Sequence, residues 1–135
     1  MKKLRYLSID EVDWFHGRIL ELSGGERGDL AKANLEFVLE RVKDVAEGLD
    51  RDKALVKKAA FLLYSLVAQH PFINGNKRTA FAVVESFLAL NGCKFKAGTD
   101  ESYRFLADIG MGNASELQVE EWIATNLAKK TKKSR

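Results

Sequence analysis

The chain has 135 residues, of which 46% are hydrophobic and 30% charged, a length and balance that suit one compact domain and are too small for two. No apolar run reaches the roughly 18 residues of a membrane span, and acidic residues from Asp10 onward interrupt any secretory signal before it can form. The single cysteine, Cys93, excludes an intramolecular disulfide and a cysteine-based zinc site, so we expect a cytoplasmic protein.

The net charge of +3 is concentrated at the C-terminus. Residues 129–135 (KKTKKSR) contain five basic residues and no acid, whereas the rest of the chain is slightly acidic. We therefore expect a single domain over residues 1–128 and a disordered basic tail over 129–135. Direct nucleic-acid binding is not expected, although the tail could add a contact with an acidic partner or a nucleic acid.

The first half of the chain predicts helices joined by glycine-containing loops. Ser8 and Glu11 form a capping-box pattern that opens a helix carrying Val12, Phe15, Ile19 and Leu22, and residues 23–28 end it. A second helix is expected to begin near Asp29 and to carry Leu30, Asn34, Phe37, Val38 and Arg41. The polar residues 43–52 are interpreted as a mobile surface segment.

The second half continues the helical pattern. The predicted apolar faces are Leu55, Val56, Ala59, Leu62, Leu63, Leu66 and Val67 in a third helix, and Ala80, Val83, Val84, Phe87 and Leu88 in a helix over 76–91. A short helix capped by Thr99-Asp100 carries Tyr103, Leu106 and Ala107, and Ser115 opens a last helix with Val119, Trp122, Ile123 and Leu127. Only residues 93–97 are expected to be extended. The pattern predicts an all-α bundle of about six helices.

Polar residues are concentrated in the connection between the two most apolar helices. His70 continues the apolar stripe of the preceding helix, Pro71 ends that helix, and Phe72 can anchor the turn. Gly75 permits a positive φ immediately before the next helix. Taken alone, His70 could be a structural histidine at a helix end. Beside an anion site, it could instead act as a general base.

The start of the helix at residue 76 has the features of an anion site. Its first amides, near Asn76, Lys77 and Arg78, have no intrahelical partner, and the two basic side chains add full positive charges. Basic residues at a helix N-terminus oppose the helix dipole, which favours a bound anion over a simple solvated pair. The segment therefore combines a base with phosphate-binding groups, the equipment of a phosphate-transfer reaction.

Residues 70–80, HPFINGNKRTA, resemble the signature loop of the Fic/Doc family, with the longest likeness to the death-on-curing (Doc) toxins. The resemblance implies a Fic-type helical bundle with the active-site loop between two central helices. It implies that His70 is the general base, that position 74 binds Mg²⁺, and that Phe72 anchors the loop. Gly75, Asn76, Lys77 and Arg78 would form the phosphate-binding nest, and residues 43–52 would be a flap over the target segment.

Three positions in the motif bear on the reaction. Lys77 and Phe81 stand where AMP-transferring relatives carry glycine and arginine, and Doc toxins share this pattern. The resemblance therefore implies transfer of the ATP γ-phosphate to a translation factor, with elongation factor Tu as the expected target. AMP transfer is the alternative. Asn74 replaces the usual Asp or Glu and should hold Mg²⁺ more weakly, which leaves a non-catalytic nucleotide- or partner-binding module as a third possibility.

No serine or threonine is followed by glutamate four residues later, so the inhibitory segment of many Fic enzymes is absent from this sequence. The resemblance then implies inhibition by a separate antitoxin protein that lies across the active-site groove. The other histidine, His16, is interpreted as a surface or structural residue. Trp14 and Trp122 occupy helical core spacing and are expected to pack in the interior.

Overall fold

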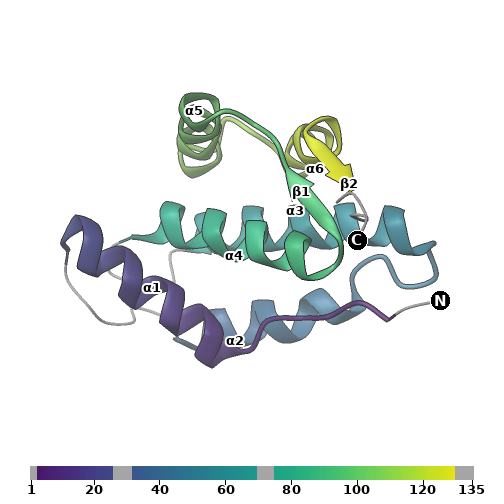
Figure 1. The fold of residues 1–135 in the computed structure, drawn as a ribbon, viewed down its shortest axis with the longest axis horizontal. Helices are drawn as coiled ribbons and strands as arrows, with labels where there is room; N and C mark the ends of the chain where they lie inside the picture. The colour runs from purple at the N-terminus through teal and green to yellow at the C-terminus, as the bar shows by residue number, and fades with distance from the viewer. Residues whose placement is uncertain (1–2, 26–31, 70–74, 130–135) are drawn as a thin grey trace, which may run out of the picture.

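The computed structural model describes residues 3–25, 32–69 and 75–129, and within these ranges it is almost entirely helical (Figure 1). The elements are α1 (Ile9–Ser23), α2 (Lys32–Arg41), the 3-10 helix η1 (Val42–Asp44), α3 (Arg51–Gln69), α4 (Asn76–Leu90), β1 (Cys93–Phe95), α5 (Thr99–Gly110), α6 (Glu116–Thr125) and β2 (Leu127–Lys129). The predicted all-α bundle of about six helices is confirmed. None of the described helices has both the length and the apolar character needed to cross a bilayer.

Helix α3 is the centre of the bundle and runs antiparallel to α4. It packs mainly against α4 and α6, with α1 and α2 on one side of the α3–α4 pair and α5 and α6 on the other (Figure 1). The α4 residues predicted as core are all buried, and so are those of α3 except the partly exposed Val56. Because these two helices carry the longest apolar stripes, burying them against each other supplies most of the core.

Both predicted capping boxes are present. The Ser8 hydroxyl accepts a hydrogen bond from the Glu11 amide (3.2 Å), and the Glu11 carboxylate accepts one from the Ser8 amide (2.8 Å). Ser115 and Gln118 make the same reciprocal pair at the start of α6. Each box satisfies amides that a helix leaves unpaired at its start, which explains why α1 and α6 begin where the sequence predicts.

The buried face of α1 differs from the predicted one. Val12, His16 and Leu20 are buried, whereas Leu22 is 79% exposed. The expectation that Trp14 packs in the core is also wrong, since its side chain is 62% exposed. Residues 12, 16 and 20 share one face at i, i+4 spacing, and position 14 is two residues, or about 200°, away from it.

The second tryptophan does pack inside the molecule. The Trp122 ring stacks on Phe105 at 4.3 Å and meets Phe95 edge-on at 5.0 Å between ring centroids. Its Nε1 atom donates a hydrogen bond to Glu101 (2.9 Å). Phe95 in turn contacts Phe81 at 5.8 Å. This aromatic cluster joins α4, β1, α5 and α6, and so fixes α5 beside α4.

The end of the described chain departs from the predicted last helix. Helix α6 ends at Thr125, and Leu127, expected to be helical, belongs to β2. Strand β2 pairs antiparallel with β1, with Cys93 opposite Lys129 and Phe95 opposite Leu127. The strand crosses the predicted domain boundary at residue 128. The predicted tail residues 130–135 lie outside the described residues.

Candidate functional site

Helix α4 begins at the predicted motif, but the structure describes only the motif's second half. Gly75, Asn76, Lys77 and Arg78 lie within the described ranges, whereas His70, Phe72 and Asn74 lie outside them. The loop's position between α3 and α4 follows from the ends of these two helices, Gln69 and Asn76. The site is therefore built here from the α4 side.

Gly75 adopts the left-handed conformation that the sequence predicts. It is the N-cap of α4, with φ 78° and ψ 18°, and its carbonyl accepts a hydrogen bond from the Thr79 amide (2.9 Å). The amides of residues 76–78 occupy the first turn of the helix, where no intrahelical carbonyl can reach them. A left-handed residue followed by successive helix-start amides forms a concave anion-binding nest.

The two basic side chains leave α4 in different directions. Lys77 lies over Gly110 at the end of α5, where its Cδ and Nζ atoms are each 3.9 Å from the position that a Cβ atom would take. Arg78 instead faces α1, where it lines a pocket with Ser23. Within the described ranges neither side chain makes an ion pair or a hydrogen bond, so both charges are available to a ligand.

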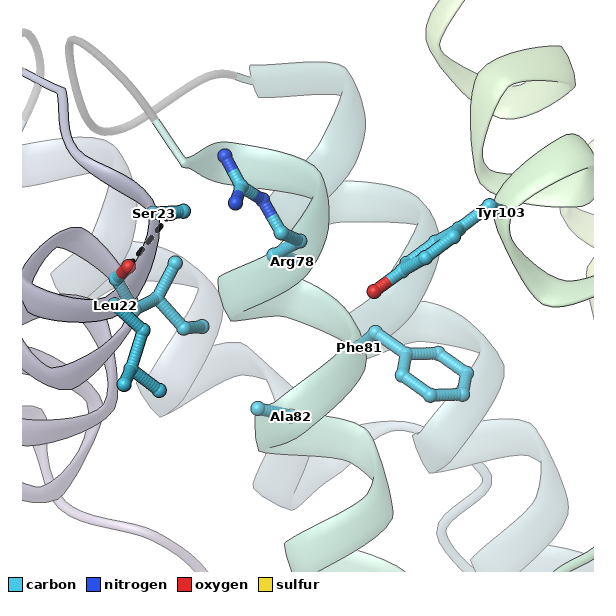
Figure 2. A pocket seen from close by; sticks show the side chains of 7 residues that line it. Leu22, Ser23, Arg78, Phe81, Ala82 and Tyr103 are labelled. Atoms are coloured by element: carbon cyan, nitrogen blue, oxygen red, sulfur yellow. Dashed lines mark hydrogen bonds between the residues drawn. The ribbon is translucent and has the colours of Figure 1, made fainter. Parts of the chain in front are cut away.

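A pocket of about 240 Å³ lies beside this helix start, between α1, α4 and α5 (Figure 2). Its lining residues are Ile19, Leu22, Ser23, Arg78, Phe81, Ala82 and Tyr103. Figure 2 shows Arg78 on the Ser23 side and Phe81 on the Tyr103 side, with the Tyr103 hydroxyl pointing toward α4. The walls are mostly apolar, with one guanidinium and two hydroxyls among them, a lining that suits a small organic ligand.

The sequence gave no sign of Ser23 or Tyr103 as pocket residues. They were read as a helix-ending loop residue and a helix-packing residue. They reach the pocket because α1 and α5 pack on either side of α4, and no residue spacing reports that placement. Tyr103 is half exposed, although core spacing was expected to bury it.

The proposed flap at residues 43–52 is wrong in position. Both terminal nitrogens of Arg51 donate hydrogen bonds to the carbonyl of Asn91 (3.4 Å), which is the C-cap of α4. Gly75 is at the opposite end of this 15-residue helix, about 22 Å away at 1.5 Å per residue. Figure 1 shows the α2–α3 connection at the end of the α3–α4 pair that is far from residues 69–76. The segment therefore cannot cover the site.

The same segment is also tied down rather than loose. Lys58 is only 4% exposed, and its Nζ atom donates hydrogen bonds to the carbonyls of Val42 (3.0 Å), Lys43 (2.9 Å) and Val45 (2.7 Å). These bonds satisfy carbonyls at the end of η1 and fix the backbone before Ala46, which has a φ of 62°. The first half of the predicted mobile segment is thus anchored to α3.

One carboxyl group on α4 has a shifted pKa. Burial raises the pKa of Glu85 above its ordinary value. Glu85 is one turn beyond Phe81 and does not line the pocket. Where the chain is described, no three His, Cys, Asp or Glu side chains gather into a metal site. The charge chemistry at the start of α4 therefore rests on Lys77, Arg78 and the backbone amides.

Comparison with known proteins identifies the family. Residues 6–88, more than half of the chain and including the whole of the 70–80 motif, match the Fic/DOC family. The chain belongs to this family. In a Fic/Doc protein, the α3–α4 connection and the nest at Gly75 are the expected location of the active site, and the matched region contains both.

Individual relatives lie on both sides of the Fic/Doc division. The chain is 38% identical to Toxin Doc of Mycolicibacterium smegmatis over 77 residues, which cover 57% of this chain and 59% of the relative. It is 29% identical over 101 residues to protein adenylyltransferase fic-1 of Caenorhabditis elegans, and 27% over 106 residues to its Caenorhabditis briggsae counterpart. These matches cover 64% and 67% of this chain but only 20% and 21% of the two fic-1 proteins.

Proposed function

We propose that this chain is a Doc-like toxin that transfers a phosphate from ATP to a hydroxyl group of a translation factor in the cytoplasm, inhibiting protein synthesis. Elongation factor Tu is the expected target. The observation that carries the proposal is the left-handed Gly75 turn at the start of α4, with Lys77 and Arg78 unpaired in the described structure. The 38% identity to Toxin Doc supports it.

In this proposal His70 acts as general base and removes the proton from the target hydroxyl. The resulting oxygen attacks the γ-phosphorus of ATP, the bond from that phosphorus to the β–γ bridging oxygen breaks, and ADP leaves. Gly75, Asn76, Lys77 and Arg78 would bind the phosphates and stabilise the charge that develops on them. Phe72 would anchor the loop that carries His70.

The proposed reaction includes Mg²⁺ held by the phosphates and Asn74. An amide oxygen is a Mg²⁺ ligand without charge, so the ATP phosphates would supply most of the binding. The described residues are consistent with this, because they offer no carboxylate cluster that could hold the ion independently. When bound, Mg²⁺ would neutralise phosphate charge during transfer.

Phe81 favours phosphate transfer over AMP transfer. In AMP-transferring relatives an arginine at this position would add a second fixed cation. Here the aromatic ring packs against Phe95 at 5.8 Å and lines the pocket, so it cannot bind a phosphate as a cation would. Similarity to two adenylyltransferases is the observation that favours AMP transfer as the second candidate.

Parallel incubations with α-labelled and γ-labelled ATP, Mg²⁺ and purified elongation factor Tu test the proposal. We expect the target to retain label from the γ position only. Label retained only from the α position would establish AMP transfer instead. A His70→Ala protein provides the control, because it should lose either activity without losing the fold.

A non-catalytic module is the third candidate, and it rests on Asn74. If the natural chain transfers nothing and Asn74→Asp creates transfer, the phosphotransferase proposal fails and the binding role gains support. Measurable Mg²⁺-dependent transfer by the natural chain excludes the binding-only role. The proposed partner in either toxin role is a separate antitoxin protein, which should suppress the transfer when added in equal amount.

A further inference from the structure

Helix α1 forms a floor beneath the Gly75 turn. The position that a Cβ atom would take at Gly75 is 3.5 Å from Leu20 Cδ2 and 3.6 Å from both His16 Cδ2 and Ile19 Cγ2. These are van der Waals contacts, and they come from three side chains on one side of α1. The turn that precedes the anion nest is thus supported from below by α1.

His16 is the polar member of this floor. It is 6% exposed and occupies the middle of the buried α1 face, between Val12 and Leu20. Its Cδ2 atom, which faces Gly75, is covalently bonded to Nε2, so a ring nitrogen lies next to the atom in contact with the turn. Burying an imidazole costs more free energy than burying a leucine or phenylalanine of similar size. Packing alone does not account for a histidine here.

The conformation of Gly75 determines where the nest points. Glycine adopts positive and negative φ with similar ease, so the residue does not by itself hold φ at 78°. The contacts with α1 restrict that freedom. The direction of the first α4 amides, and of Lys77 and Arg78 with them, then depends on how firmly the floor holds the turn.

We propose that His16 is a positioning residue for the active site: its imidazole holds the left-handed turn at Gly75, and so orients the α4 amides toward phosphate. The proposal rests on the proposed function for the identity of the ligand. It concerns a residue outside the 70–80 motif and on a different helix. His16 touches the turn and not the reacting atoms, so its substitution should act through the nest.

Three variants separate the ring nitrogens from the packing. His16→Phe keeps the ring volume and removes both nitrogens, whereas His16→Gln keeps a polar group of comparable reach. Leu20→Met is the matched control, because it alters the same floor while conserving volume and apolar character. If His16→Phe does not fold, as judged by circular dichroism, His16→Leu takes its place.

The first measurement needs no nucleotide. Hydrogen exchange at the Thr79 amide reports the turn directly, because this amide donates to the Gly75 carbonyl (2.9 Å). We expect exchange at least tenfold faster in His16→Phe, equivalent to about 1.4 kcal/mol of local opening, and near-normal exchange in His16→Gln and Leu20→Met. Exchange in the centre of α3 should be unchanged in all three.

The second measurement is the dissociation constant for ATP with Mg²⁺, together with kcat and KM for γ-phosphate transfer. We expect His16→Phe to weaken ATP binding about tenfold and to lower kcat by up to about 10²-fold through misplaced phosphates, with His16→Gln recovering most of both. Wild-type exchange and affinity in His16→Phe would overturn the proposal. Equal defects in Leu20→Met would reduce His16 to packing. If the natural chain binds no ATP, the proposed function fails, and the exchange measurement still decides the role of His16.

Discussion

The two ends of the α3–α4 pair treat their polar groups in opposite ways. At the far end, Lys58 donates to three backbone carbonyls, and the Asn91 side chain bonds both the amide and the carbonyl of Arg5 (2.8 and 3.0 Å). At the near end, Lys77 and Arg78 make no such bonds within the described residues. The two ends have similar helices and similar cations, but only one of them satisfies its charges internally.

This difference separates stability from function. A buried cation with three carbonyl partners stabilises the fold, and removing it leaves acceptors without donors. Unpaired cations at a helix start oppose the helix dipole and make the fold slightly less stable. Proteins commonly retain such unfavourable local features at binding sites. The near end is therefore the end that should lose function, and not stability, when it is altered.

His70→Ala gives the largest expected effect on this comparison. Loss of a general base typically lowers the rate by roughly 10²–10⁴-fold, so we expect γ-phosphate transfer and toxicity to disappear. Thermal unfolding should stay within a few degrees of the natural protein. A fully active His70→Ala protein would remove the proposed mechanism.

Lys58→Met tests the far end. The substitution keeps a long apolar stem but removes the donor to the carbonyls of Val42, Lys43 and Val45, and we expect the free energy of unfolding to fall by about 3 kcal/mol. Urea unfolding measures it. Lys57→Met is the matched control: its surface ion pair with Glu120 (2.8 Å) should contribute only about 0.5 kcal/mol. Equal losses in the two variants would mean that the Lys58 bonds are not special.

Arg78→Ala and Lys77→Ala test the near end. Each removes one unpaired cation from the nest, so we expect ATP binding to weaken about tenfold in each, with a dependence on salt that becomes shallower. The melting temperature should not fall, and relief of the opposed helix dipole could raise stability by about 0.5 kcal/mol. Calorimetric titration and thermal unfolding give both quantities. Lys94→Ala, an exposed lysine on β1, controls for the change in net charge.

The sequence allowed the helices to be predicted better than their neighbours. Capping at Ser8 and Ser115 and the long stripes of α3 and α4 are local signals, and the structure confirms them. The buried face of α1 was misjudged, because Leu22 and Trp14 become exposed or buried according to which helix lies beside them. The flap was misplaced for the same reason, since only the antiparallel packing of α3 and α4 shows which loops share an end.

The nest was predictable because its signals are also local: a glycine, a helix start and two basic residues follow each other in the chain. The floor beneath it was not. His16 is 59 positions from Gly75, and a lone histidine in a helix carries no sign of the turn that it contacts. Similarly, Tyr103 reaches the pocket only because the aromatic cluster around Trp122 holds α5 against α4.

Glu85→Gln gives the smallest expected effect and concerns the middle of α4, between the two ends. Burial raises the pKa of this carboxyl in the folded state, so its favourable contribution is present below its ordinary value of 4.5 and is lost as pH rises through the raised pKa. At neutral pH the ionised carboxylate therefore opposes folding. We expect Glu85→Gln to be more stable than the natural protein at pH 7, by a few tenths of a kcal/mol because solvent screens a partly exposed group. The gain should shrink to nothing near pH 4, where urea unfolding of both proteins should coincide. A gain that persists unchanged at pH 4 would show that the amide stabilises the helix for a reason other than charge.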